Sequence, residues 1–290
     1  MSMDRLDALL RRFHVGMRLF HAGALCGITD LASSDGSGHL HVIRSGRVEL
    51  VHSDVGLPAR QLIEEPTVLL YPTGLAHRFL TDPERGADMV CAEVHFGGGR
   101  EHPLARALPA MQCWPISATP TLAPVIELLI AEAFGGRCGG RIAVDRLFEV
   151  LLIQLLRLQI DSGQLHSGLL AGLAHPQLRR ALIRMHEAPA EAHTLVSLAE
   201  CAQMSRSRFA EAFRQTVGMT ALDYLGDWRI TLAQSALRRG RSLQQVADEV
   251  GYGSAIAFNR AFKARTGTAP GAWRRAALGA GGGAGASARA

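Results

Sequence analysis

The sequence predicts an α+β protein of two domains, with an N-terminal β-barrel followed by a helical segment and then a C-terminal all-α domain. Three observations lead to this prediction. The 290 residues exceed one small domain, since a domain usually takes roughly 100–200 residues. Short apolar stretches separated by turn residues fill residues 20–97, and helical periodicity follows from residue 120 onward. The chain is 48% hydrophobic and 20% charged, so both domains can bury a core.

Composition argues against several classes of protein. No apolar run reaches the roughly 18 residues of a membrane span. The N-terminal residues alternate acid and base and lack the apolar stretch of a signal peptide. Five cysteines are an odd number in a chain of this length, which argues against a disulfide framework. We therefore expect a cytoplasmic protein without a membrane partner.

Turn signals and changes of periodicity divide the chain. The parts are a barrel domain at residues 1–115, a helical connector at residues 116–162, an all-α domain at residues 177–275 and a disordered Gly/Ala tail at residues 276–290. Residues 161–176, with Ser162-Gly163 and His175-Pro176, indicate a linker.

The connector contains two amphipathic helices, predicted at residues 121–134 and 142–160. A stripe as broad as that of the second helix usually buries against another surface. We expect it to pack partly on its own barrel and partly on a second chain, as a homodimer; complete burial within one chain is the alternative. The stripe consists of Leu147, Val150, Leu151, Leu155 and Leu158.

The all-α domain contains an internal repeat of helix, tight turn and second helix. Leu198-Ala199 and Val246-Ala247 lie in the first helices of the two copies, 48 residues apart. The small alanine lets two helices cross closely, and a phenylalanine pair at i and i+4 anchors the second helix. The repeat therefore predicts two helix-turn-helix motifs. Each pair follows its turn, as Phe209 and Phe213 or Phe258 and Phe262.

Charge follows the same division. Residues 176–275 hold 15 basic against 8 acidic side chains, a net of +7, whereas residues 1–175 hold 15 against 18, a net of −3. A basic domain behind a mildly acidic one is typical of a nucleic-acid-binding domain attached to another domain. A solvated basic face without a polyanionic partner is the alternative.

On these residues the all-α domain resembles the DNA-binding domain of AraC/XylS-type transcription regulators. The resemblance implies sequence-specific binding to double-stranded DNA, and RNA polymerase as a partner if the protein is an activator. Ala221 departs from the family, which usually has Pro after Gly-x-Thr, and we expect only the local turn to differ. The matching segments are residues 195–199, 204–209, 213, 224–225 and 228–229, then 246–247, 251–252, 258, 260, 262–263, 267 and 270.

The second helix of each copy presents an outer face that would enter the major groove. Arginine pairs with guanine, asparagine with adenine, glutamate accepts from cytosine N4, and small side chains contact a thymine methyl group or either base. Flanking arginines suit phosphates better. The candidate DNA-contacting residues are Arg206, Ser207, Arg208, Ala210, Glu211 and Arg214 in the first copy and Ser254, Ala255, Ile256, Asn259, Arg260 and Lys263 in the second. We also expect one helix, at residues 226–240, to link the two copies.

Residues 20–110 resemble the cupin-type sensor domain that one AraC subgroup carries, which implies a domain that responds to a metal, an oxidant or a small molecule. The matching segments include Cys26-Gly27, His39-x-His41, Pro72-x-Gly74-x-x-His77 and Val90-Cys91. Metal-binding cupins usually have a Glu shortly after the first His pair, and this sequence has Arg44-Ser45-Gly46 there.

The histidines suggest a zinc site. His39 and His41 share one strand face because side chains alternate with period two, and His77 comes from a later strand. Cys91 could replace the missing Glu, with Glu93 and His95 as substitutes. Three imidazoles and one thiolate suit tetrahedral Zn²⁺. A metal-free barrel with hydrogen-bonded histidines is the alternative.

Two cysteines suggest redox chemistry as a second use. Cys26 and Cys91 lie at positions that resemble the cysteines of the family's sensor domain. A thiol beside Arg or His could be a reactive thiolate. The two could close a disulfide if their Cα atoms lie within roughly 7 Å of each other. Two buried, inert cysteines are the alternative.

These observations favour a DNA-binding transcription regulator whose cupin-like domain senses a signal. A metal-dependent cupin enzyme with a helical appendage is the competing hypothesis. An enzyme has no need of a basic, duplicated DNA-reading module. Gly-x-Ser-x-Gly, Gly-rich phosphate-loop and His-Glu-x-x-His motifs are absent from the sequence, so we expect no catalytic residue.

Overall fold

The computed structural model describes residues 4–32, 36–54, 56–97, 102–163, 165 and 167–281. The described residues form two compact units: residues 14–162, called the β unit, and residues 4–13 together with 163–281, called the helical unit. Among the described residues, no helix combines the length and apolar character needed to cross a bilayer.

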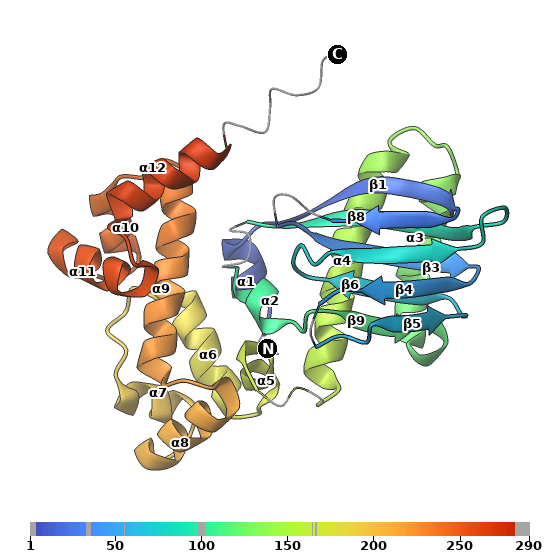
Figure 1. The fold of residues 1–290 in the computed structure, drawn as a ribbon. Coiled ribbons are helices and arrows are strands. Elements are labelled where there is room, and N and C mark those ends of the chain that lie inside the picture. The colour runs from blue at the N-terminus through green and yellow to red at the C-terminus, as the bar shows by residue number, and fades with distance from the viewer. Residues whose placement is uncertain are drawn as a thin grey trace. The chain divides into compact units, whose positions relative to one another are not determined.

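Nine strands of the β unit form two antiparallel sheets (Figure 1). The five-stranded sheet has the order β1-β8-β3-β6-β9 and the four-stranded sheet the order β2-β7-β4-β5. The strands are β1 (Val15–Leu25), β2 (Ile28–Leu31), β3 (Gly38–Ser45), β4 (Val48–His52), β5 (Arg60–Ile63), β6 (Thr67–Tyr71), β7 (His77–Thr81), β8 (Ala87–Phe96) and β9 (Gln112–Pro115).

The predicted barrel is wrong in one respect, because the two sheets do not close into a barrel. β1 is an edge strand of the first sheet, and the chain leaves that sheet at Gly27, which has a φ of +74°. β2 then pairs with β7 in the second sheet, so no ladder among the described strands connects the two sheets. The inner faces enclose an apolar core that includes Leu50, Leu69 and Phe79.

Helices α3 (Ala123–Phe134) and α4 (Gly140–Asp161) confirm the two connector helices, and both pack within the β unit. α4 lies against β1 at a β-bulge between Leu19 and His21. The Leu19 N–H donates to Asp145 Oδ1 at 2.7 Å, and Arg141 donates to the Leu19 carbonyl at 3.1 Å. Side chains of α4 thereby hydrogen-bond the backbone N–H and C=O groups of Leu19, which have no partner among the described strands on the outer side of this edge strand. The short helix α2 (Pro103–Ala107) and two 3₁₀ turns, η2 (Ile116–Ala118) and η3 (Pro120–Leu122), flank β9.

The helical unit contains nine helices within the described residues. They are α1 (Asp7–Arg12), α5 (Leu169–Ala174), α6 (Leu178–Glu187), α7 (Leu195–Cys201), α8 (Arg206–Val217), α9 (Ala221–Arg238), α10 (Leu243–Glu249), α11 (Ala255–Thr266) and α12 (Pro270–Gly281).

Four predicted boundaries need correction. Residues 161–176 are not only a linker, because α5 lies there with its leucines buried against α6 and α8. The linking helix α9 begins at Ala221, where Thr220 caps it. α12 extends through residues 276–281 of the predicted disordered tail, and residues 282–290 lie outside the described residues. The first residues, predicted as part of the barrel domain, pack with the helical unit.

α1 completes the core of the helical unit. The Phe13 ring meets Trp228 edge-on at 5.1 Å, and Arg12 donates to the Glu187 carbonyl at 2.7 Å. His186 stacks on Trp228 at 4.0 Å and hydrogen-bonds the Tyr224 hydroxyl at 2.6 Å. Burial, with a smaller effect of Arg12, lowers the pKa of His186 to about 3, so this imidazole is neutral inside the core.

The turns of the two helix-turn-helix copies both have a residue in the left-handed conformation at the same position, but the residue type differs. Gln203 has a φ of 55°, and Gly251 has a φ of +82° at the matching position of the second copy. The next N–H closes the turn in both copies, from Met204 to the Ala199 carbonyl and from Tyr252 to the Ala247 carbonyl, each at 2.9 Å. Gln203 is therefore strained, whereas glycine adopts this conformation freely.

We expect Gln203→Gly to stabilise the helical unit by ~0.5–1 kcal/mol. The free energy gained by removing the left-handed strain exceeds the free-energy cost of the greater conformational entropy that glycine gives the unfolded chain. Gly251→Ala should destabilise it by ~2 kcal/mol or more, since its Cβ would also lie 2.5 Å from Ala190 Cα. Denaturant unfolding of the full chain measures both changes.

Gly218→Ala is the matched control, because Gly218 also has a positive φ, of +90°, but open space around its Cβ position. It should cost less than Gly251→Ala. Equal losses at the two glycines would contradict the close packing of Gly251 on Ala190.

Candidate functional site

The two helix-turn-helix copies are built alike. In each copy a serine caps the second helix: Ser205 Oγ accepts from the Arg208 N–H at 3.4 Å, and Ser254 Oγ accepts from the Ala257 N–H at 3.1 Å. The phenylalanine pairs are buried, and within each pair the ring centroids lie 5.6 Å apart. The rings therefore fix one face of α8 and of α11 and leave the opposite face outward.

The predicted reading residues lie on these outward faces. In α8 and at its start, Arg206, Ser207, Arg208, Glu211 and Arg214 are exposed, and Ala210 is half-buried. In the second copy every predicted residue is exposed, and the Ile256 side chain is 82% exposed. An apolar side chain this exposed at the start of a polar helix face is available for contact with a partner.

The outward face of α8 borders a hollow of about 880 Å³. The sequence did not reveal that the start of α7 and the start of α9 also line it, through Leu195 and Leu222. No sequence signal indicated this, because it depends on how α7, α8 and α9 pack; Leu222 is exposed there, just after the capping Thr220. Ala221, the departure from the family pattern, is buried in the first turn of α9, where Pro is also tolerated.

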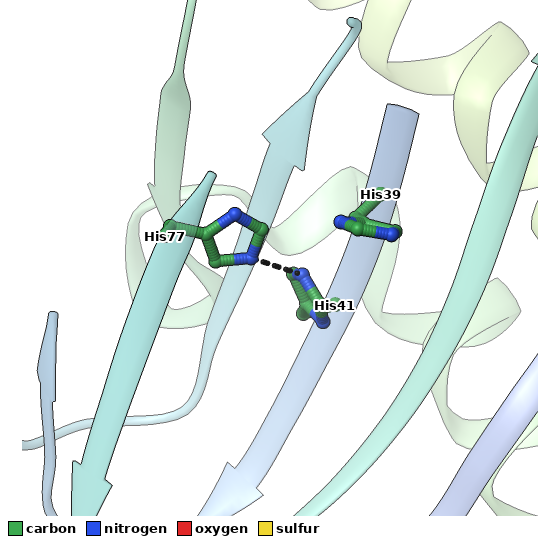
Figure 2. Close-up of side chains that lie close together, drawn as sticks. All are labelled: His39, His41 and His77. Atoms are coloured by element: carbon green, nitrogen blue, oxygen red, sulfur yellow. Dashed lines mark hydrogen bonds between the residues drawn. The ribbon is translucent and has the colours of Figure 1, made fainter. Parts of the chain in front are cut away.

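Three histidines meet in the interior of the β unit (Figure 2). His39 and His41 come from β3, and His77 comes from the start of β7 in the other sheet. One nitrogen of each ring lies within 4.8 Å of the others, and His41 Nε2 lies 3.1 Å from His77 Nε2. All three side chains are buried. The structure therefore brings together three of the four predicted metal ligands.

The protein holds His77 in one tautomer. Its Nδ1–H donates to the Leu75 carbonyl at 2.9 Å, which leaves the Nε2 lone pair directed at His41. The Tyr71 ring stacks on His77 at 3.8 Å, nearly parallel, and the Tyr71 hydroxyl pairs with His52 at 2.8 Å. A backbone carbonyl behind a histidine ring is the common outer-shell partner of a metal-binding imidazole.

Burial keeps His41 and His77 neutral. It lowers the pKa of His77 to about 3, against a smaller opposing effect of the Leu75 carbonyl. Burial and then the neighbouring His77 lower the pKa of His41 well below its usual value. His41 Nδ1 has no hydrogen-bond partner among the described residues. Neutral imidazoles fit a metal ion, because metal ligands must be deprotonated.

Cys91 does not join the histidines, which corrects the predicted fourth ligand. It lies directly opposite His41 in the β3–β8 ladder, in the apolar core that also holds Ile43 and Met89, but its Sγ is not among the ligand atoms that lie within 4.8 Å of one another. Burial raises the pKa of the Cys91 thiol, so the thiol is protonated and is not a reactive nucleophile. The proposed substitutes are engaged elsewhere, since Glu93 pairs with Arg18 at 2.7 Å and with His95 at 3.1 Å.

Cys26 and Cys91 do not meet the distance condition for a disulfide. Cys26 is exposed, and its Sγ lies beside Gly86. Cys91 lies five positions after Gly86, along β8, and at ~3.3 Å per residue this offset is roughly 16 Å. A disulfide needs Cα atoms within roughly 7 Å. The two cysteines are therefore not a preformed redox pair in this fold.

Two family models match this chain. The model described as Cupin matches residues 4–161, and the model described as Helix-turn-helix domain matches residues 198–276. The first match covers more than half of the chain and coincides with the β unit and α1. The second covers both copies of the repeat.

Named relatives agree with these matches. An AraC-like transcription regulator of Streptomyces lividans is 42% identical over 133 residues, which cover 45% of this chain and 44% of the relative. The chain thus matches under half the length of that relative. An uncharacterized HTH-type transcriptional regulator of Haemophilus influenzae is 27% identical over 90% of this chain and 95% of its own length. The Escherichia coli RCS-specific HTH-type transcriptional activator RclR is 26% identical over 82% of this chain and 86% of its own length. With a cupin domain ahead of a duplicated helix-turn-helix domain, the chain belongs to the AraC/XylS family of transcription regulators.

Proposed function

We propose that the protein regulates transcription by binding a specific double-stranded DNA sequence through α8 and α11. The observation that carries this proposal is the pair of equally built helices, each held by a buried phenylalanine pair and each exposing a polar face. The net charge of +7 over residues 176–275 supplies the attraction to phosphates. If the protein activates transcription, RNA polymerase is its further partner.

The two reading faces differ in chemistry. On α11, Asn259 is the candidate for adenine, Arg260 for guanine and Ile256 for a thymine methyl group. On α8, Glu211 is the candidate acceptor from cytosine N4, beside the small Ser207. The remaining basic residues, Arg206, Arg208, Arg214 and Lys263, suit the phosphates. An operator for this protein would therefore have two half-sites of different sequence.

The β unit would sense the signal through His39, His41 and His77. The three converging imidazoles suit Zn²⁺, which would supply a Lewis-acidic centre with one coordination position open to an external ligand. An anionic or neutral small molecule at that position would then be the effector. Because Cys91 lies outside the cluster and far from Cys26, a metal-linked or small-molecule signal fits the geometry better than thiol oxidation.

The connector helices support a homodimer. Of the predicted stripe of α4, Leu151 and Leu155 are buried within the β unit, Leu147 and Leu158 are half-buried, and Val150 is exposed. Four apolar side chains on α3 and α4, Val150 of the stripe among them, are exposed, and a surface of this kind is typical of an interaction site. They are Leu128, Phe134, Ile142 and Val150.

Arg260→Ala should weaken binding to the selected operator by ~1–3 kcal/mol, because it removes a bidentate contact to guanine. Binding to random duplex should change little. Arg206→Ala, at a phosphate-facing position, should weaken binding to both duplexes alike and is the matched control. Fluorescence anisotropy with an operator selected from a random library measures both. An Arg260→Ala protein that binds operator and random duplex as the parent does would show that the reading face is wrongly assigned.

Protein purified without chelator should contain about one zinc ion per chain, as expected for one three-histidine site. His77→Ala should lose the metal, because His77 joins the two sheets at the cluster. Cys91→Ser should retain it and is the matched control. Elemental analysis together with circular dichroism checks metal content and fold. A folded parent that neither contains nor takes up stoichiometric zinc would contradict the metal proposal.

Ile142→Glu should shift the full-length chain toward monomer at micromolar concentration, because it places a charge on the exposed apolar surface of α3 and α4. Ile28→Glu, at a side chain of similar exposure on β2, should leave the oligomeric state unchanged: the exposed fractions are 67% and 70%. Sedimentation velocity measures both. A parent that stays monomeric with and without operator DNA would rule out the dimer.

A further inference from the structure

The two helix-turn-helix copies are joined by more than the helix between them. Arg229 lies near the middle of α9, and its side chain reaches the loop between α6 and α7. Its Nε donates to the Pro189 carbonyl at 2.7 Å, and its Nη2 donates to the Glu191 carbonyl at 2.8 Å. Two hydrogen bonds from one rigid guanidinium fork hold this loop in a single position relative to α9.

The same guanidinium contacts the second copy. Arg229 Cζ lies 5.7 Å from the centroid of the Tyr252 ring, which is within the roughly 6 Å range of a cation–π contact. Tyr252 belongs to the turn that leads into α11, and the loop on the other side of Arg229 leads into α7. One side chain therefore contacts the loop ahead of α7, which packs against the reading helix α8, and the turn just ahead of the reading helix α11.

Backbone packing brings these two segments together. Gly251, next to Tyr252, lies so close to Ala190 that a Cβ would be 2.5 Å from its Cα. The neighbouring Glu191 is also held from the side, because Arg184 of α6 donates to both of its carboxylate oxygens at 2.7 Å. The loop at residues 188–191 thus contacts the turn of the second copy directly, beside Arg229.

A second contact ties α11 itself to α9. Arg265 Nε donates to Asp227 Oδ1 at 2.9 Å. Its guanidinium lies over Gly226, where a Cβ would be 2.0 Å from Arg265 Nη2. α11 is therefore fixed to α9 close to Arg229, two residues further along the same helix.

We propose that Arg229 is a positioning residue that fixes the spacing and orientation of the two DNA-reading helices, so that the protein accepts operators of one half-site separation only. The inference rests on the proposed function. One inserted base pair moves a half-site by ~3.4 Å and rotates it by ~35° about the duplex axis. A rigid pair of readers cannot follow that change, whereas a pair joined by α9 alone could bend or twist to reach both half-sites.

The test uses the full chain and a set of duplexes in which the half-sites of the selected operator are moved apart or together by one and two base pairs. The parent should lose about tenfold or more in affinity for each one-base-pair change, since one half-site is then misaligned. Arg229→Ala should bind the original operator about fivefold or more weakly and should vary only about threefold across the set, because the readers lose their common anchor.

Two further variants keep the test sharp. Arg229→Lys retains the charge but lacks the fork that reaches two carbonyls, so it should behave like Arg229→Ala even if the alanine variant folds poorly. Arg239→Ala removes a charge from the end of the same helix, where Arg239 donates to Ser235 within that turn. It should keep the parent's dependence on spacing.

The spacing profile separates positioning from a general structural role. Arg229 variants that are weaker at every spacing but keep the parent's profile would overturn the inference and leave the proposed function intact. A folded parent that selects no DNA sequence at all would overturn the proposed function, and this inference with it. Thermal unfolding of each variant confirms that the compared proteins are folded.

Discussion

The helical unit depends on the burial of two phenylalanine pairs. Phe209 with Phe213 and Phe258 with Phe262 are the side chains that face inward from α8 and α11, and all four are almost fully buried. Each aromatic ring buries a large apolar area and fixes the rotation of its helix about its own axis. Because that rotation is fixed from the inside, the outer positions are free to carry any chemistry. The two copies share their cores and differ in their outer faces for this reason.

The β unit meets a different constraint, which is the cost of burying polar rings. An imidazole in an apolar interior is stable only in its neutral form, because burial penalises the charged one. The Nδ1–H of His77 donates a hydrogen bond to a backbone carbonyl, and the Tyr71 ring stacks on the face of the imidazole. The remaining nitrogens then converge from two sheets onto one point. Burial therefore produces the electronic state that a metal requires, and among the described residues no carboxylate joins the three nitrogens.

The helical unit also shows how one chain can keep a duplicated motif rigid. α9 supplies the covalent link, and Arg229, Asp227 and Gly226 add contacts on either side of it. Gly226 and Gly251 stand where a Cβ would collide with a guanidinium or with the backbone of a neighbouring loop. This packing therefore requires glycine at both positions, just as it requires the buried phenylalanine rings.

Much of this organisation could be predicted from the sequence. The repeat, the inward phenylalanines and the outward residues of α8 and α11 follow from spacing along single helices, since a helix has a fixed period. The pairing of His39 with His41 on one strand face follows from the period of a strand. The sequence also placed the two connector helices to within two residues at each end. These are local properties, and neighbours in the sequence determine them.

Contacts between distant segments could not be predicted in this way. Cys91 was expected to join the histidines; it shares the inner face of the sheet with His41, yet its thiol lies outside the group of three imidazole nitrogens. The sheets were expected to close, but the chain leaves the first sheet at Gly27 and no ladder rejoins it within the described residues. α1 joins the helical unit through Phe13 and Trp228, although more than two hundred residues separate them. The sequence by itself determined which residues face in or out of each helix and strand, because backbone geometry sets that period. Only the tertiary structure decided which faces meet, because burial of apolar area is not directional and depends on the whole arrangement.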